Sequence, residues 1–363
     1  MLSVMKVVPA DTLKLSDYDE IIDVRAPVEF AEDHLPGALN LPVLNDEERA
    51  LVGTIYKQES VFEARKVGAS LVSANISQYL AGHLRDKPGG YRPLLYCWRG
   101  GQRSRSMATV FDEVGWPVTL LEGGYKAFRG RVLADLRETP KRFSYRVLAG
   151  LTGTGKTEIL KELASRGEQV LDLEGLANHQ GSLLGEPEAG QNMSQKRFES
   201  RLWHALSSFD LARAVWTEAE SAKIGQVFCP KALLQMLRSS VRIEVEVPMA
   251  DRVAYLNARY KTWESRREVL MGKLKWLNRR HGQAEIDVWQ ELVDTGQWRE
   301  FVQRLLEVHY DPAYRSALEK NSDGPARALS TRDLLGEGCV QAAQSLLQMD
   351  FGLLTPILDQ TEH

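Results

Sequence analysis

Residues 94–106 read LLYCWRGGQRSRS, so an apolar run ends at Cys97 and a turn rich in glycine and arginine follows. Backbone amides opened by Gly100 and Gly101, with the positive end of a following helix, would stabilise negative charge on the sulfur. Arg103 adds a nearby cation. We therefore predict an acidic, nucleophilic thiol at Cys97.

Two chemistries fit this cysteine loop. Its pattern CxxGxxRS presents Arg99, Arg103 and Arg105, which can pair with an oxyanion such as phosphate. The thiolate would carry a chalcogen atom as a persulfide or perselenide, or attack a phosphoryl group as in a cysteine phosphatase. A buried structural cysteine is the remaining alternative. Cys229 and Cys339 lack such surroundings and are expected to be packing residues.

A second candidate site is GLTGTGKT at residues 150–157, a full match to the phosphate loop pattern GxxxxGK[ST]. The strand-like RVLA precedes it and the helical pattern TEILKELAS follows. Glycines let backbone amides converge on phosphate oxygens, Lys156 supplies a cation, and Thr157 offers a hydroxyl to Mg²⁺. The predicted phosphate-binding residues are Gly150, Gly153, Thr154, Gly155, Lys156 and Thr157.

Such a loop recognises phosphates rather than the group attached to them, and the sequence holds no NKxD stretch that would read guanine. Asp172 and Glu218 each end an expected strand, at the sheet edge where α/β proteins bind ligands. Either carboxylate could hold Mg²⁺ or position a substrate, or could simply cap a helix. His204 and His281 lack partners at metal-binding spacing, so no metal is predicted beyond Mg²⁺ at Thr157.

Residues 259–281 carry eight Lys or Arg against two Glu, with Tyr260, Trp263 and Trp276 interleaved. One interpretation is an amphipathic helix whose aromatic rings enter the core while its charges are solvated. The other is a surface for an RNA backbone, with an unpaired base stacked on an exposed ring. The candidate contacts, to RNA or as a lid over the phosphate site, are Arg259, Arg266 and Arg267.

The elements that must position these motifs alternate between strand and helix. Short apolar runs predict strands at 20–25, 93–97 and 118–124, with helices at 62–84 and 104–114. A second set of strands is predicted at 145–150, 168–174, 214–221 and 241–248, with a helix beginning near Lys156 and a mainly helical chain from residue 251. This alternation favours parallel sheets covered by helices.

At 363 residues the chain should form two domains. The charged stretch DLRETPKRFS places a linker within residues 134–144, so the domains are expected at 1–135 and 136–363. A net charge of −3 excludes global attraction to nucleic acid, so any polyanion needs a local basic surface. Three scattered cysteines argue against a disulfide framework. Without a secretory or membrane-spanning segment, a reducing cytoplasm is expected.

Two stretches flanking the cysteine carry a family resemblance. DVRAPVEFAEDHLPGALNLP at 23–42 and LLEGGYKAF at 120–128 resemble the rhodanese family over roughly residues 5–130. The resemblance implies a rhodanese fold with Cys97 at the family's sulfur-carrying position. The cysteine loop is longer than the common sulfurtransferase version, a feature shared with dual-specificity phosphatases of this fold.

The order of CWRGGQRSRS, LLEGGYKAFR, GLTGTGKTEIL and DLEGLANHQGSLLG at 172–185 is similar to the bacterial tRNA 2-selenouridine synthase family over nearly the whole chain. The stretch HQGS is its most distinctive part. This resemblance implies an α/β protein, with a rhodanese-like domain followed by a P-loop NTPase-like parallel-sheet domain and a helical C-terminal part. It implies replacement of sulfur by selenium in the wobble 5-substituted 2-thiouridine of tRNA.

The resemblance also implies co-substrates and roles. Selenophosphate would donate selenium through Cys97, with Arg99 and Arg103 receiving its phosphate. Geranyl diphosphate would donate a prenyl group, its diphosphate held by Lys156 and Mg²⁺, to give an S-geranyl intermediate. The expected partners are the tRNA anticodon loop and an enzyme that supplies selenophosphate. A cysteine phosphatase fused to a small-molecule kinase, and an RNA-binding scaffold without activity, are the alternatives.

Overall fold

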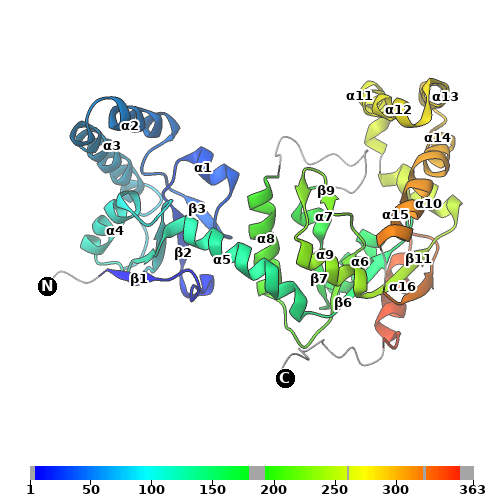
Figure 1. Cartoon of the computed structure of the whole chain (residues 1–363), viewed down its shortest axis with the longest axis horizontal. Coiled ribbons are helices and arrows are strands. Elements are labelled where there is room, and N and C mark those ends of the chain that lie inside the picture. The colour runs from blue at the N-terminus through cyan, green and yellow to red at the C-terminus, as the bar shows by residue number, and fades with distance from the viewer. Residues whose placement is uncertain (1–4, 180–192, 260, 322–323, 352–363) are drawn as a thin grey trace. The chain divides into compact units, whose positions relative to one another are not determined.

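The computed structural model of the protein describes residues 5–179, 193–259, 261–321 and 324–351. The chain divides into two compact units, the first formed by Met1–Leu136 with Ser194–His204 and the second by Arg137–Met193 with Ala205–His363 (Figure 1). Each unit is built on a five-stranded parallel sheet. The expected α/β fold class is confirmed. Most of the HQGS stretch lies outside the described residues.

The first unit has the strand order β1-β5-β4-β2-β3. Its strands are β1 (Lys6–Val8), β2 (Glu20–Asp23), β3 (Ala38–Asn40), β4 (Pro93–Tyr96) and β5 (Thr119–Leu121). Its helices are α1 (Pro27–Glu32), α2 (Asp46–Gln58), α3 (Val61–Ala81), α4 (Gln102–Val114) and α5 (Gly124–Glu138). The strands and helices expected in this unit are all present. Strand β4 shows why such strands could be predicted, because it is buried at every position and a parallel strand covered on both faces is continuously apolar.

The start of α5 holds the cysteine loop in place. The backbone N–H of Tyr125 donates to the carbonyl oxygen of Cys97 at 2.8 Å, and that of Lys126 donates to Trp98 at 3.0 Å. Gly124 has φ +58°, and a Cβ atom there would lie 2.3 Å from the Cys97 carbonyl oxygen. The GG of LLEGGYKAF therefore allows two loops to approach more closely than any side chain permits.

The stretch expected as a linker, 134–144, contains the boundary between the two units after Leu136, and α5 continues through it as far as Glu138. Leu136 is buried, which gives the helix an apolar anchor in a stretch that reads as charged. A short 3-10 helix, Thr139–Arg142, follows, with the buried Pro140 in its first turn, where a missing N–H costs nothing.

Helix α8 (Gln195–Ser207) packs largely with the first unit, although its place in the sequence lies between strands of the second. The ring of Trp203 meets Phe128 of α5 edge-on, with centroids 5.4 Å apart. The Ser200 hydroxyl donates to a carboxylate oxygen of the buried Asp33 at 2.8 Å. The region 136–363, expected as one domain, thus contributes one helix to the first unit's core.

The second unit has the strand order β12-β11-β6-β8-β7 and a separate hairpin of β9 and β10. Its strands are β6 (Tyr145–Ala149), β7 (Gln169–Leu171), β8 (Val215–Glu218), β9 (Lys223–Ile224), β10 (Val227–Phe228), β11 (Val241–Glu246) and β12 (Ala326–Ser330). Strand β12 falls in the region expected to be mainly helical. It is an edge strand exposed at all but one position, so it lacks the apolar pattern that identifies a buried strand.

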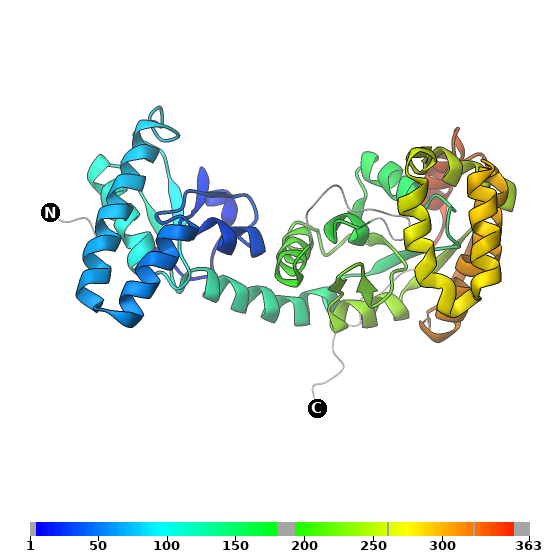
Figure 2. The same cartoon turned by 90° about the horizontal axis from the view of Figure 1, so that it is seen from above.

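The helices of this unit are α6 (Lys156–Ser165), α7 (Leu173–Leu176), α9 (Lys231–Ser239), α10 (Met249–Arg259), α11 (Arg267–Leu274), α12 (Asn278–His281), α13 (Gln283–Asp294), α14 (Trp298–Leu305), α15 (Asp311–Asn321) and α16 (Gly338–Gln348). Helices α6 and α16 pack together over the sheet core. Figure 2 shows α11 to α14, in yellow and orange, as a separate helical layer with its own core. Among the described residues, no helix is long and apolar enough to span a membrane.

We predict that Gly124→Ala lowers the free energy of unfolding of the first unit by at least about 2 kcal/mol, because the new Cβ would overlap the Cys97 carbonyl oxygen and φ is positive. The control is Gly130→Ala, an exposed position of the same helix with open space around it, which should change stability by no more than about 1 kcal/mol, in the stabilising direction. Thermal unfolding followed by circular dichroism measures both. Equal stability of the two variants would contradict the proposed close approach.

Candidate functional site

Cys97 lies at the junction of β4 and α4 with only 3% of its surface exposed. The Gly101 backbone N–H donates to its sulfur at 3.2 Å and the Ser104 hydroxyl donates at 3.3 Å. Burial raises the pKa of the thiol, but the Ser104 bonds and a backbone amide lower it by more, so the pKa lies below its ordinary value of 9.0. The direction of this shift agrees with the acidity predicted for Cys97, and Ser104 is a donor that the sequence analysis left unassigned.

The arginines of the cysteine loop differ in their surroundings. Arg103 forms an ion pair with Glu29 of α1 at 2.6 Å, and its electrostatic effect on the Cys97 pKa is smaller than that of the hydrogen bonds. Arg99 and Arg105 are exposed. Arg99 and Arg105 are therefore the cations that the loop presents to solvent, whereas Arg103 is held by a carboxylate.

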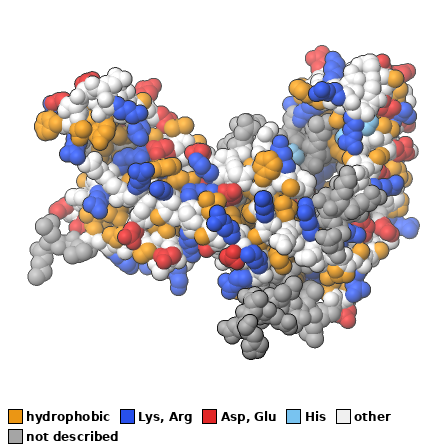
Figure 3. Space-filling view, in the orientation of Figure 1, with side chains coloured by type: hydrophobic (Ala, Val, Ile, Leu, Met, Phe, Trp, Pro, Cys, Tyr) orange, Lys and Arg blue, Asp and Glu red, His pale blue; other side chains and the backbone are white. Residues whose placement is uncertain are grey.

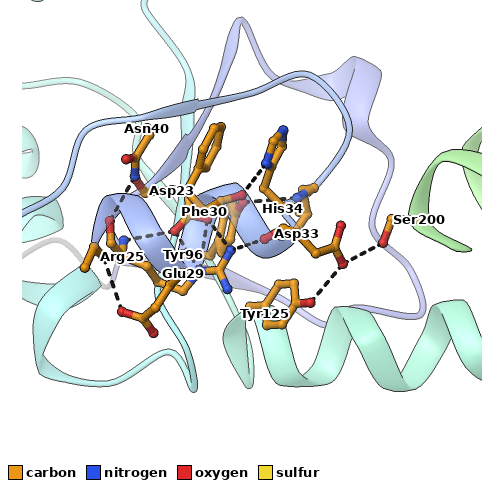
Figure 4. A network of polar contacts seen from close by, with 12 residues as sticks. Asp23, Arg25, Glu29, Phe30, Asp33, His34, Asn40, Tyr96, Tyr125 and Ser200 are labelled. Atoms are coloured by element: carbon orange, nitrogen blue, oxygen red, sulfur yellow. Dashed lines mark hydrogen bonds and ion pairs between the residues drawn. The ribbon is translucent and has the colours of Figure 1, made fainter. Parts of the chain in front are cut away.

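A buried polar network of Asp23, Arg25 and Asp33 lies next to α1 (Figure 4). Arg25, 1% exposed, pairs with Asp23 and donates to the Asp33 carbonyl oxygen at 2.7 Å. Its guanidinium also lies 4.0 Å from the centre of the Tyr125 ring. The sequence DVR thus places a buried ion pair in the interior of the first unit. The Tyr125 ring, in contact with Arg25, belongs to α5, the helix that holds the cysteine loop.

The phosphate loop runs from the end of β6 to the start of α6. The Lys156 ammonium donates to the carbonyl oxygens of Gly150 at 2.8 Å and Leu151 at 3.4 Å, so it lies over the loop. The Thr154 hydroxyl donates to Leu151 at 2.9 Å and is buried, which turns it away from any ligand. Thr157 lies in the first turn of α6, at the positive end of the helix.

Helices α10 and α15 hold this loop from outside. Arg252 of α10 donates to the Thr152 carbonyl oxygen at 2.9 Å and forms a buried ion pair with Asp311 of α15. The Gly150 N–H donates to the Tyr314 hydroxyl oxygen at 2.6 Å. The loop's shape therefore depends on residues more than a hundred positions later, which no sequence motif indicated.

A cluster of three carboxyl groups, Glu174, Glu218 and Glu220, lies beside Lys156. Each offers an oxygen within 4.8 Å of the others. Burial, with repulsion from the other two, raises the pKa of Glu218 well above its ordinary range, and burial with the nearby Glu174 raises that of Glu220 to about 8. Sequence reasoning found Glu218 alone. Two features of the sequence could have identified the other carboxylates: the alternation in TEAE for Glu220, and the position of Glu174 just after β7.

Asp172 occupies the other position expected for Mg²⁺ or substrate. Its carboxylate accepts the Gly175 N–H at 2.8 Å and caps α7, the alternative weighed for an acid in this place. It nevertheless contributes to the raised pKa of Glu174 and Glu218, so its charge is felt in the cluster.

The glutamate cluster suits a divalent cation. Glu218 is 1% exposed, and its Oε1 atom has no hydrogen-bond partner. A buried, unpartnered carboxylate oxygen is costly unless a proton or a metal ion satisfies it. Carboxylate oxygens beside a phosphate site are the ligands Mg²⁺ prefers, and the Thr157 hydroxyl would supply another.

The basic segment at 259–281 is not one amphipathic helix but a series of short turns and helices. Trp263 is buried, as expected if the aromatic rings enter the core. Trp276 is 80% exposed, as expected if a ring is available to stack on a base. Tyr260 lies outside the described residues. The three candidate arginines all contact protein groups: Arg259 pairs with Glu158, Arg266 lies over Trp263, and Arg267 donates to the Asp294 carbonyl oxygen.

The remaining cysteines are buried thiols rather than acidic ones. Cys229 and Cys339 are buried, and burial raises the pKa of these thiols to about 12 and about 11, as expected for packing residues. His281 and His309 hydrogen-bond to each other at 3.0 Å, a pairing that their separation in the sequence concealed.

We predict that Cys97 is alkylated by iodoacetamide with a pH midpoint below 9.0, because hydrogen bonds stabilise its thiolate. Ser104→Ala should raise that midpoint by about one pH unit. The control is Ser106→Ala, which removes a hydroxyl bonded only to the Gln102 carbonyl oxygen and should leave the midpoint unchanged. Peptide mass mapping assigns the label. Equal midpoints in the two variants would show that Ser104 does not tune the thiol.

Comparison with known proteins supports the resemblance inferred from the motifs. A family model for the tRNA 2-selenouridine synthase AAA domain matches residues 143–335, and a rhodanese-like domain model matches residues 9–131. The tRNA 2-selenouridine synthase of Nitrosomonas europaea is 40% identical over 237 residues, which cover 64% of this chain and 61% of that protein.

Two further relatives extend over most of the chain. The tRNA 2-selenouridine synthase of a Sulfurovum species is 32% identical, over 83% of this chain and 89% of that protein. That of Chromohalobacter salexigens is 34% identical, over 89% of this chain and 93% of that protein. The chain therefore belongs to the tRNA 2-selenouridine synthase family.

Proposed function

We propose that this enzyme replaces sulfur by selenium at C2 of the wobble 5-substituted 2-thiouridine of tRNA, through an S-geranyl intermediate. The observation that carries the proposal is that one chain of this family holds two different anion sites, an acidic thiol at Cys97 and a phosphate loop around Lys156. Two anionic donors, selenophosphate and geranyl diphosphate, match the two sites. Because the substrate is tRNA, we place the enzyme in the cytoplasm.

The phosphate loop would serve the first step, alkylation of the thiocarbonyl sulfur. The bond between C1 of the geranyl group and its diphosphate oxygen breaks, and pyrophosphate leaves with the electron pair. Sulfur forms the new bond to C1, and the base loses its N3 proton. The Lys156 ammonium and the amides of the loop stabilise the charge that develops on pyrophosphate. No reader of a nucleotide base is needed for this role.

The cysteine loop would serve the second step. Alkylation turns sulfur into a better leaving group, so selenium can add at C2 while geranyl thiol departs. The P–Se bond of the donor is then hydrolysed to phosphate. Arg99 and Arg105 are exposed beside Cys97 and can attract the selenophosphate, while the Gly101 amide and the Ser104 hydroxyl stabilise a negatively charged chalcogen at the cysteine.

Mg²⁺ would be held by the glutamate cluster and the Thr157 hydroxyl. When bound, it supplies charge neutralisation for the diphosphate and its leaving group. The protein's own contribution is to keep these carboxyl groups buried next to Lys156, where their charge is poorly solvated and a cation is favoured.

The tRNA would contact the basic segment. Trp276 is 80% exposed, and the short helical turns around it carry Lys275, Arg279 and Arg280. Proteins that bind single-stranded RNA usually combine cations, which neutralise the phosphates, with an exposed aromatic ring, which stacks on a base. In the view of Figure 3, basic and acidic side chains are otherwise interspersed over the surface.

The phosphatase alternative receives less support. A phosphatase of this type needs the arginine of CxxGxxR to bind the phosphoryl oxygens, and Arg103, in that position, is paired with Glu29 at 2.6 Å. The resemblance implied Arg99 and Arg103 as the residues that receive selenophosphate; with Arg103 in an ion pair, the proposal assigns this role to the exposed Arg99 and Arg105.

We predict that the two steps separate by mutation. Lys156→Ala should slow geranylation of thiolated tRNA by about a hundredfold, because the leaving pyrophosphate loses its cation. Cys97→Ala should spare geranylation and abolish selenouridine formation. Controls are Lys161→Ala, an exposed lysine of the same helix, and Cys229→Ala. Mass spectrometry of tRNA nucleosides measures both products. If both variants lose both steps while folded and still binding tRNA, the division of roles is wrong.

We predict that Mn²⁺, used as a spectroscopic substitute for Mg²⁺, binds the glutamate cluster. Glu218→Gln should weaken its affinity by about tenfold or more, because the buried carboxylate oxygen is lost. Glu246→Gln, at the end of β11 and outside the cluster, should bind Mn²⁺ as the unaltered protein does. The electron paramagnetic resonance signal of free Mn²⁺ gives the affinity. Equal affinities in folded variants would exclude the cluster as the metal site.

A further inference from the structure

An apolar pocket opens in the second unit between α10, α11 and α14. It encloses about 530 Å³ counted to its open mouth. We call it the aromatic pocket. The apolar side chains that line it include Trp263, Leu270, Trp298, Phe301, Val302 and Leu305. Most of this space is open to solvent, and the enclosed interior is only about 30 Å³, well below the roughly 300–1,000 Å³ of small-molecule sites, so a bound chain requires the walls to move apart.

The aromatic pocket adjoins the phosphate loop directly. Thr152, the third residue of the loop, is itself one of the lining residues, as is Leu256 of α10. A Cβ added at Gly153 of the loop would lie 2.8 Å from the Leu256 side chain, so loop and pocket wall are in contact. The ion pair of Arg252 and Asp311 fixes this arrangement, because Arg252 also donates to the Thr152 carbonyl oxygen.

The chemistry of the pocket changes abruptly at the loop. On one side lie the Lys156 ammonium and the glutamate cluster, which suit phosphate and a divalent cation. On the other side the walls are indole, phenyl and aliphatic groups, with polar atoms contributed at the margin by Asn257 and Glu264. A ligand that spans both regions must have a strongly anionic head and a hydrocarbon tail. A nucleotide, whose base needs hydrogen-bonding partners, fits these walls poorly.

We propose that the aromatic pocket binds the hydrocarbon chain of the prenyl diphosphate donor and selects its length. This inference rests on the proposed function for the diphosphate head and adds the residues that recognise the tail. Burial of the chain against these side chains supplies binding energy in proportion to its apolar area. The interior is narrow, with room for only a few water molecules, so a flexible chain enters as the half-buried Trp298 and Val302 move aside.

A packing gap is the competing explanation. The pocket borders the compact core of the helical layer, where Trp263, Leu270, Phe301 and Leu305 pack together. A gap of that origin would have no reason to open at the phosphate loop, and filling it would stabilise the protein without changing donor selection. The two explanations therefore differ in what a larger side chain at the pocket wall does.

The experiment compares donors of five, ten and fifteen carbons, namely dimethylallyl, geranyl and farnesyl diphosphate, with thiolated tRNA, Mg²⁺ and the full-length enzyme. Val302→Trp should raise the KM for geranyl diphosphate at least about tenfold and leave that for dimethylallyl diphosphate nearly unchanged, because it fills the pocket beyond the loop. The control is Leu292→Trp, also half-buried against the helical core but outside the pocket. It should leave all three KM values unchanged.

A binding measurement accompanies the kinetics. Isothermal titration with the unreactive geranyl S-thiolodiphosphate and with inorganic pyrophosphate should show weaker binding of the first to Val302→Trp and unaltered binding of the second. If Val302→Trp folds and its preference among the donors matches that of the unaltered protein, the pocket is a packing gap and the inference fails. If no prenyl donor binds the unaltered protein, the proposed function itself fails, and the two results are distinct.

Discussion

One ammonium group, that of Lys156, faces three carboxyl groups that burial separates from water. Each of Glu174, Glu218 and Glu220 has its pKa raised by burial and lowered in part by this cation. A single positive charge cannot neutralise three carboxylates in a poorly solvated place, so the cluster must keep protons or take up a metal ion. The anion binding proposed for the phosphate loop and the cation binding proposed for the cluster would therefore be linked through Lys156.

The shape of the phosphate loop is maintained from outside its own motif. Arg252 and Asp311 form a buried ion pair, and loss of either partner would be strongly destabilising because it leaves an unpaired buried charge. The arginine also holds the loop by donating to the Thr152 carbonyl oxygen. Tyr314 accepts the Gly150 N–H at the other end of the loop. Helices α10 and α15 thus support the loop, while α11 and α14 of the helical layer form walls of the apolar pocket.

Much of this could be predicted from residue patterns. Strands β2, β4, β5, β6, β7, β8 and β11 were predicted because buried parallel strands are continuously apolar, whereas the short edge strands β1 and β3 of the first sheet were not. The lowered pKa of Cys97 was predicted from glycines at a strand–helix junction. Strand β12 was missed because an exposed edge strand carries no such pattern. The stretch expected as a linker contains the boundary between the units, but its first part is helical because Leu136, one apolar anchor among charged residues, continues α5 to Glu138.

The sequence by itself determined the two loops that could stabilise a negatively charged group, since their glycines, lysine and cysteine act through local backbone geometry. It also determined the family. Only the tertiary structure decided which distant groups complete each site. Glu29 reaches Arg103, Glu174 joins Glu218, and Tyr314 meets Gly150, in each case between residues separated by more than forty positions. Such contacts arise from how helices pack on the sheets, which depends on the whole core and leaves no local pattern.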